Sequence, residues 1–115
     1  MENLLAALKA LSDETRLRII NLLYNGELCV CDIMETLQIS QAKASRHLIY
    51  LKNAGLVKDR RAAQWVWYAL AKDERLQFID KLVFDNLRQI ELYQQDLRNL
   101  TAWLECKEVP AVKNN

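Results

Sequence analysis

The apolar residues recur at three- and four-residue intervals over most of the chain, which is the spacing of amphipathic helices. They predict a short first helix over residues 4–11 and a second helix that stops at Asn25-Gly26. Ser12 is predicted to cap the second helix, because its side-chain oxygen can accept a hydrogen bond from a free backbone N–H group.

Two further helices are predicted close together in the middle of the chain. The third helix is expected to begin at Cys29 or Cys31 and to end at Leu37. Ser40 is expected to cap the fourth, which runs to Ala54. Two helices that are separated by about three residues, the second opening with polar residues, form the helix-turn-helix pattern.

The next two segments alternate in side-chain character and predict a pair of strands. Residues 56–61 and 65–70 are rich in strand-forming residues and flank a short polar bend. The bend over residues 61–64 has neither Gly nor Asn, so a loop longer or less regular than a two-residue turn is expected. The pair is predicted to form the hairpin, or wing, of a winged helix-turn-helix.

A long final helix is predicted over residues 73–106, on the order of 30 residues or about 45 Å. Such a helix exceeds the reach of a small domain, so a second subunit is expected to cover part of its apolar stripe. Residues 1–107 are thus predicted to be one domain, and residues 108–115 a flexible tail. The predicted fold is mainly α with one β-hairpin, in the order ααααββα, and it dimerises through the terminal helices.

Composition supports a mostly helical intracellular protein. Apolar residues make up 51% of the chain and charged residues 27%, while only two Gly and one Pro interrupt it. No apolar run approaches the roughly 18 residues of a membrane span, and the N-terminal residues do not resemble a signal peptide. Three cysteines, an odd number, favour reduced thiols, so a cytoplasmic location is predicted.

The net charge of +1 is unevenly distributed along the chain. Asp59 is the single acidic residue between residues 40 and 64, whereas acidic residues outnumber basic ones over residues 72–108. The basic residues of the middle segment are Lys43, Arg46, Lys52, Lys58, Arg60 and Arg61. Binding to phosphates requires such a concentration of positive charge, so this segment is predicted to face nucleic acid.

The second helix of a helix-turn-helix enters the major groove of DNA, where Gln can pair with adenine and Arg with guanine. From this helix, the residues predicted to contact double-stranded operator DNA are Ser40, Gln41, Lys43, Ser45, Arg46 and His47. The wing is predicted to add Arg60, Arg61 and Gln64. His47 is the sole histidine, and a phosphate or packing contact is expected of it rather than metal binding or catalysis.

Several sequence motifs, in this order, resemble the ArsR/SmtB family of bacterial metal-responsive repressors. They are Leu8-Lys9-Ala10-Leu11-Ser12-Asp13-Glu14-Thr15-Arg16-Leu17, Gly26-Glu27-Leu28-Cys29-Val30-Cys31-Asp32-Ile33, Ile39-Ser40-Gln41, Ser45-Arg46-His47-Leu48, Ala54-Gly55-Leu56-Val57 and Trp65-Val66-Trp67-Tyr68. The resemblance runs from about residue 4 to residue 70. It implies a dimeric winged helix-turn-helix repressor that is similar to the arsenite-responsive members.

Cys29 and Cys31 are the candidate ligands for an inducing ion. Residues two apart point to nearly opposite sides of a helix, but to one side of an extended segment. Joint binding of one soft ion therefore needs a non-helical start of the third helix. We expect ion binding to pull the first turn of this helix into a conformation that is incompatible with DNA binding. The alternative interpretation is that both cysteines are small buried hydrophobic residues.

The resemblance narrows the choice of ion to As(III) or Sb(III). Related arsenic sensors often place a third cysteine where this chain has Met34, cadmium- or lead-type members draw cysteines from an N-terminal extension, and zinc-type members use histidines on the last helix. Cys106 is either the third ligand or an uninvolved thiol, and both readings stay open. Cadmium or lead sensing, and sensing of redox or sulfur species, are alternatives on the same scaffold.

Two other classes of function are less consistent with the sequence. A cysteine nucleophile needs a nearby base, yet His47 lies on the groove-facing helix, and no phosphate loop or acidic pair is visible. No enzymatic activity is therefore predicted. A winged helix that binds only protein would lack the steep salt dependence that several phosphate contacts give to DNA binding.

Overall fold

Four helices occupy the first half of the chain. The computed structural model describes residues 2–113, except for the side chains of residues 2, 75 and 108–113. The four helices are α1 (Glu2–Ala10), α2 (Glu14–Leu23), α3 (Val30–Leu37) and α4 (Gln41–Asn53). The predicted helix-turn-helix is confirmed, with α3 and α4 packed against each other.

Side-chain caps fix where two of these helices begin. Ser40 caps α4 as predicted, and its Oγ accepts a hydrogen bond from the Lys43 backbone N–H at 3.1 Å. The cap predicted for α2 was wrong by one residue, because the Asp13 carboxylate accepts from the Arg16 N–H at 3.0 Å. The Ser12 hydroxyl instead donates to the Lys9 carbonyl at the end of α1.

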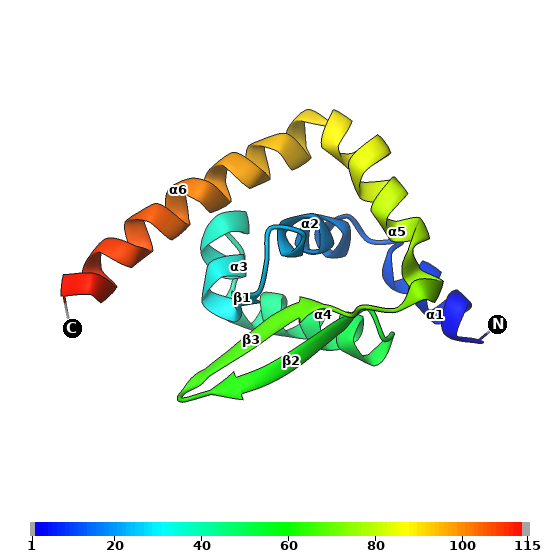
Figure 1. Ribbon diagram of the computed structural model, residues 1–115, viewed down its shortest axis with the longest axis horizontal. Helices are drawn as coiled ribbons and strands as arrows, with labels where there is room; N and C mark the ends of the chain where they lie inside the picture. The colour runs from blue at the N-terminus through cyan, green and yellow to red at the C-terminus, as the bar shows by residue number, and fades with distance from the viewer. Residues whose placement is uncertain (1, 114–115) are drawn as a thin grey trace.

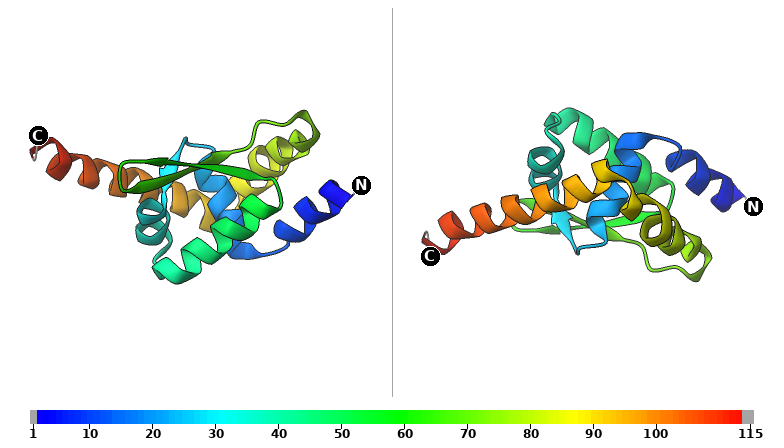
Figure 2. Two further views of the ribbon diagram at one scale, coloured as in Figure 1. Left: turned by 90° about the horizontal axis from the view of Figure 1, so that it is seen from below. Right: turned by 90° about the horizontal axis from the view of Figure 1, so that it is seen from above.

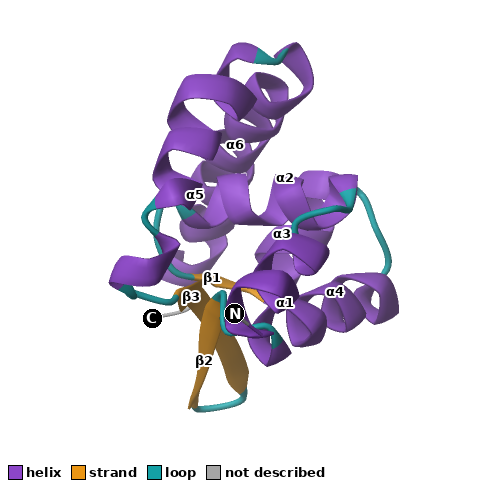
Figure 3. Ribbon diagram, turned by 90° about the vertical axis from the view of Figure 1, so that its right-hand side faces the viewer, coloured by secondary structure: helices purple, strands orange, loops and turns teal. Residues whose placement is uncertain are grey.

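The wing belongs to a sheet of three antiparallel strands. They are β1 (Leu28–Cys29), β2 (Val57–Ala62) and β3 (Trp65–Leu70), in the spatial order β1-β3-β2. The predicted hairpin β2–β3 is confirmed and projects from the helical body (Figure 3). Strand β1 was not predicted, because two residues are too few to show an alternating pattern.

The hairpin turn is tighter than the sequence indicated. Ala62 pairs directly with Trp65, so the loop contains only Ala63 and Gln64, and the expectation of a longer loop was wrong. Ala63 has a φ of +57°, in the left-handed region that two-residue hairpin turns require. Alanine adopts this conformation at a cost of roughly 1–2 kcal/mol, which the pairing of the flanking strands offsets.

The single helix expected over residues 73–106 is divided into several segments. They are η1 (Glu74–Leu76), α5 (Phe78–Lys81), a π-helical turn η2 (Leu82–Asn86), η3 (Leu87–Gln89) and α6 (Glu91–Lys113). The extended backbone of Ile90, with φ −97° and ψ 129°, separates η3 from α6, and the chain turns sharply there (Figure 1). Of the tail expected from residue 108, residues 108–113 continue α6, while residues 114–115 lie outside the described residues.

The core forms around α2, whose Ile19, Ile20 and Leu22 are completely buried. Polar contacts also bind α2 to the C-terminal segments. Arg18 forms a bidentate ion pair with the buried Asp96 of α6, with N–O distances of 2.8 and 2.9 Å. No helix among the described residues combines the length and apolar character needed to cross a membrane.

Candidate functional site

The exposed side of α4 carries most of the residues that were predicted to read DNA. Gln41, Lys43 and Arg46 are exposed, as is the capping residue Ser40, and Ser45 is half-buried. Seen from below, α4 and the hairpin lie together in front of α2 and α6 (Figure 2, left). The helix and the wing therefore lie on the same side of the molecule in this view.

His47, on the same helix, contacts the start of α2. Its Nδ1 lies 3.3 Å from an Arg16 guanidinium nitrogen and 4.0 Å from an Asp13 carboxylate oxygen. Burial lowers the pKa of His47, and the nearby Arg16 adds to this, while Asp13 opposes it. The ring thus makes a packing contact between α4 and α2.

The three predicted wing residues differ in their surroundings. Arg61 and Gln64 are exposed near the tip of the hairpin. Arg60 reaches back to Glu27, which precedes β1, in a bidentate ion pair of 2.6 and 2.7 Å. The guanidinium of Arg60 also lies 6.0 Å from the centre of the Trp67 ring. In this structure Arg60 joins the wing to the segment that precedes Cys29 and Cys31, called the thiol pair below.

Cys29 and Cys31 lie where β1 ends and α3 begins. Cys29 has extended backbone, with φ −90° and ψ 168°, and pairs with Trp67 of β3. It is the residue immediately before α3, whereas Cys31 lies in the first turn of that helix. Cys29 is only 2% exposed and Cys31 is half-buried. One thiol is therefore on extended backbone and the other on helical backbone.

The thiol of Cys29 has a charged neighbour from the other end of the chain. The Lys107 Nζ of α6 lies 3.8 Å from the Cys29 Sγ and 5.2 Å from the centre of the Trp67 ring. Burial raises the pKa of Cys29, and the Lys107 charge works in the opposite direction. The lysine opposes this shift without reversing it, so the pKa of Cys29 stays above its ordinary value.

Asp32 is a residue of this site that the sequence analysis did not assign a role. Its carboxylate is completely buried and accepts three hydrogen bonds: from the Cys29 backbone N–H at 2.9 Å, the Trp103 indole at 2.8 Å and Lys107 at 2.7 Å. Burial would raise the pKa of Asp32, but these donors outweigh it and the pKa is lowered. The spacing of Asp32 from Cys29 suits a helix cap, whereas its partners on α6 leave no local signal in the sequence.

Cys106 is exposed on α6, beside Lys107 in the sequence. Among the residues that the structure describes, no three His, Cys, Asp or Glu side chains are grouped so that they could hold one metal ion. A single chain in this conformation therefore does not bring Cys106 together with Cys29 and Cys31.

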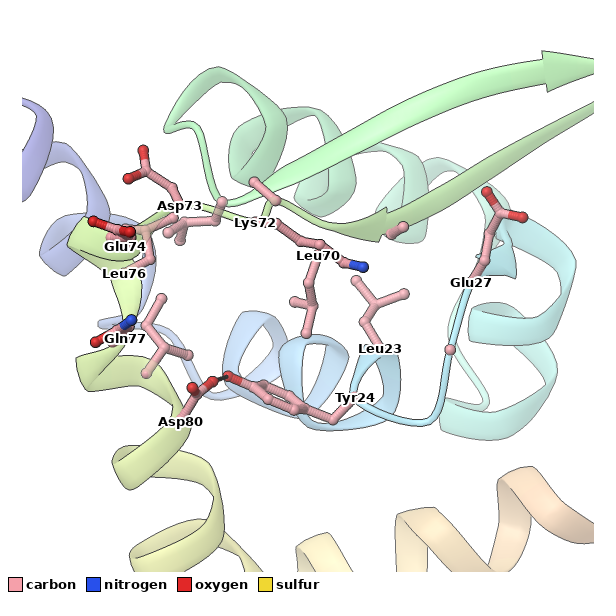
Figure 4. A pocket seen from close by; sticks show the side chains of 15 residues that line it. Leu23, Tyr24, Glu27, Leu70, Lys72, Asp73, Glu74, Leu76, Gln77 and Asp80 are labelled. Atoms are coloured by element: carbon pink, nitrogen blue, oxygen red, sulfur yellow. Dashed lines mark hydrogen bonds between the residues drawn. The ribbon is translucent and has the colours of Figure 1, made fainter.

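A separate cavity of about 670 Å³ lies between the end of α2, the base of β3 and the η1–α5 segment (Figure 4). Its wall includes Leu23, Leu76 and the Tyr24 hydroxyl, which donates a 2.5 Å hydrogen bond to Asp80. None of the three cysteines lines it. The cavity and the thiol pair are thus different features of the molecule.

The helix-turn-helix, the exposed basic helix and the adjoining wing define a winged helix-turn-helix DNA-binding protein. Comparison with known proteins agrees. The family described as bacterial regulatory protein, arsR family, matches residues 13–59. A homodimeric winged helix-turn-helix domain of Mb0332 from Mycobacterium bovis, titled a possible ArsR-family regulator, is 32% identical with a TM-score of 0.65, covering 73% of this chain and 80% of that one. The chain belongs to the ArsR family.

Other relatives carry more specific names. The arsenic resistance transcriptional regulator ArsR1 of Pseudomonas putida is 46% identical over 65% of this chain and 59% of its own length. The arsenical resistance operon repressor of Escherichia coli is 53% identical over 55% of each chain. The CadC homolog of Staphylococcus aureus, a cadmium resistance regulatory protein, is 45% identical over 64% of this chain and 61% of its own.

Among solved structures, HlyU of Vibrio cholerae is 37% identical with a TM-score of 0.65, covering 70% of this chain and 88% of that chain. The chain spans little more than half the length of the two arsenic-resistance relatives. These relatives are named as regulators of transcription rather than enzymes, which agrees with the prediction that the chain is not an enzyme.

Proposed function

We propose that the protein is a homodimeric transcriptional repressor that releases its operator DNA when As(III) or Sb(III) binds Cys29 and Cys31. The observation that carries the proposal is the position of the two thiols at the junction of β1 and α3, the first helix of the helix-turn-helix. The arsenic-resistance names of two relatives support the choice of ion.

The thiol pair has the chemistry that arsenite needs. Arsenite is As(OH)₃ at neutral pH, and each cysteine exchanges one As–O bond for an As–S bond, with the thiol proton leaving in water. Two such exchanges release two water molecules and leave one hydroxide on arsenic. We infer that this hydroxide, rather than Cys106, completes the pyramid, because Cys106 is exposed and is not grouped with the other two thiols.

Ion capture opposes DNA binding because both sulfurs must approach one atom. Cys29 is held in the sheet by its pairing with Trp67, whereas Cys31 is held in the first turn of α3. Bringing both sulfurs to one ion alters that turn, and α3 packs directly on the DNA-reading helix α4. The two binding events then weaken each other by the same factor, typically about 5–150-fold.

Exposed apolar residues support the dimer. On α1, Leu4, Leu5 and Leu8 are between 42% and 58% exposed, and Phe84 of η2 is 48% exposed. Figure 1 shows α1 and α5 at the same end of the molecule, away from the far end of α6. A two-fold axis there would allow two α4 helices to read half-sites about 34 Å apart on the duplex.

The proposal is tested by titrating the reduced protein with sodium arsenite, with and without a duplex selected by the protein from a random library. Arsenite should release the duplex from the wild type and from Cys106→Ser, but not from the double variant Cys29→Ser/Cys31→Ser. Release from the double variant would refute thiol sensing at this pair. Loss of release in Cys106→Ser would instead assign Cys106 as the third ligand.

A second ion is favoured by one observation, the 45% identity to the CadC homolog. Cadmium prefers four donors, and among the described residues no three His, Cys, Asp or Glu side chains are placed so that they could hold one ion. Parallel titration with cadmium chloride separates the two. Release by cadmium at lower concentration than by arsenite would replace the arsenic proposal with the cadmium one.

A further inference from the structure

The junction of β1 and α3, which carries Cys29 and Cys31, is attached to α6 through the buried carboxylate of Asp32. Asp32 belongs to the same turn of α3 as Cys31, and its side chain is completely buried. Two of its three hydrogen-bond donors, Trp103 and Lys107, come from α6. Because a buried charge is strongly disfavoured without partners, these two side chains hold α6 against the start of α3.

Lys107 also restricts access to the first thiol. Cys29 and Trp67 are direct partners on neighbouring strands, so their side chains lie on the same face of the sheet. Lys107 Nζ lies near both of them, 3.8 Å from the sulfur and 5.2 Å from the ring centre. The sulfur is nearly inaccessible to solvent. An ion that binds this sulfur therefore competes with its contact to the lysine.

We propose that Trp103 and Lys107 are positioning residues that transmit ion capture at Cys29 and Cys31 to the α3–α6 contact and so to DNA release. The inference rests on the proposed function of the thiol pair. When the ion displaces Lys107, Asp32 loses its counter-charge. The Asp32 carboxylate also holds the Cys29 N–H at the start of α3, so the first turn of that helix must rearrange.

The matched variants are Trp103→Phe and Lys107→Met, which remove a donor but keep most of the side-chain volume. Arg98→Met is the control, because Arg98 lies on the same helix and pairs with Glu91 at the surface. For each protein, the dissociation constant of the selected duplex is measured with and without saturating sodium arsenite.

In the wild type and in Arg98→Met, arsenite should weaken DNA binding by about 5–150-fold. In Trp103→Phe and Lys107→Met, arsenite should still bind, but should weaken DNA binding by less than about threefold. A full arsenite effect in both variants overturns the inference. Loss of arsenite binding in either variant also overturns it, since the residue would then serve capture rather than transmission.

A measurement on the otherwise unaltered protein guards against variants that fail to fold. Fluorine NMR of protein labelled with 5-fluorotryptophan gives one signal for each of Trp65, Trp67 and Trp103. Arsenite should shift the Trp103 signal and leave that of Trp65, at the exposed end of the hairpin, in place. An unchanged Trp103 signal overturns the inference.

These experiments distinguish a failure of the proposed ion site from a failure of the proposed transmission through α6. If Cys29→Ser/Cys31→Ser still releases DNA with arsenite, the thiol pair is not the inducer site. If that double variant is unresponsive while Trp103→Phe and Lys107→Met keep the full effect, the thiol site stands and only its transmission through α6 is wrong.

Discussion

Charged side chains in this molecule differ greatly in how much water surrounds them, and this decides what each ion pair contributes. The Arg18–Asp96 pair joins α2 to α6, and its carboxylate is almost completely buried. The Arg98–Glu91 pair has a comparable N–O distance of 2.7 Å, but both of its side chains are exposed. Removal of a partner is costly in the first pair and nearly neutral in the second.

Asp96→Ala is therefore expected to lower the free energy of unfolding by about 3 kcal/mol, because it leaves the Arg18 charge partly buried without a partner. Glu91→Ala, the control, should change it by less than about 1 kcal/mol. Urea denaturation followed by circular dichroism measures both. Equal effects of the two substitutions would contradict this account.

His47 is expected to make stability depend on pH. Its pKa is lowered in the folded protein, chiefly by burial, so the unfolded chain takes up the proton first as the pH falls. Stability is complete above the unfolded value of about 6.5 and is lost as the pH falls through it toward the folded value. The pH profile should be flatter in His47→Gln between about pH 7.5 and pH 5. Parallel unfolding curves for the two proteins would exclude this role.

At the scale of elements, the sequence predicted the parts that have a local signal. Ser40 as a cap and the alternation of residues 65–70 act through neighbours in the chain, and both were confirmed. The break at Ile90 was missed, because apolar residues continue at helical spacing on both sides of it. The short strand β1 and the partners of Asp32 depend on contacts between distant segments, which no local pattern reveals.

The hairpin turn provides a test at this scale. Ala63→Gly should raise the free energy of unfolding by about 0.5–1 kcal/mol, because glycine adopts the positive φ of this position without strain. Ala62→Gly, one residue earlier in paired β2, should lower it, because glycine weakens a strand. Thermal unfolding of the two variants compares them directly. Destabilisation by Ala63→Gly would show that the turn is not strained.

For the whole molecule, exposed apolar residues are found on more than one surface, and they need not have the same role. Leu5 of α1 is 58% exposed and lies at the end of the molecule that we propose as the dimer interface. Ile49 is 50% exposed but lies on α4, the helix that was predicted to read DNA. The similar exposure of the two residues makes them a matched pair.

Leu5→Glu is expected to convert the dimer to a monomer at micromolar concentration, since it places a charge where the second subunit would bury an apolar side chain. Ile49→Glu should leave the dimer intact. Light scattering coupled to size-exclusion chromatography measures both, and circular dichroism checks that the helices remain. A dimeric Leu5→Glu protein, or a monomeric wild type, would place the interface elsewhere.

The absence of a connecting loop between β1 and α3 has a consequence for how such proteins can change. Cys29 is the last residue of β1 and Val30 the first of α3, so no loop separates the strand that pairs with the wing from the helix-turn-helix. An insertion of three or four residues between Cys29 and Val30 would let the end of β1 move without moving α3. Under the proposed function, ion binding would then no longer alter the affinity for DNA.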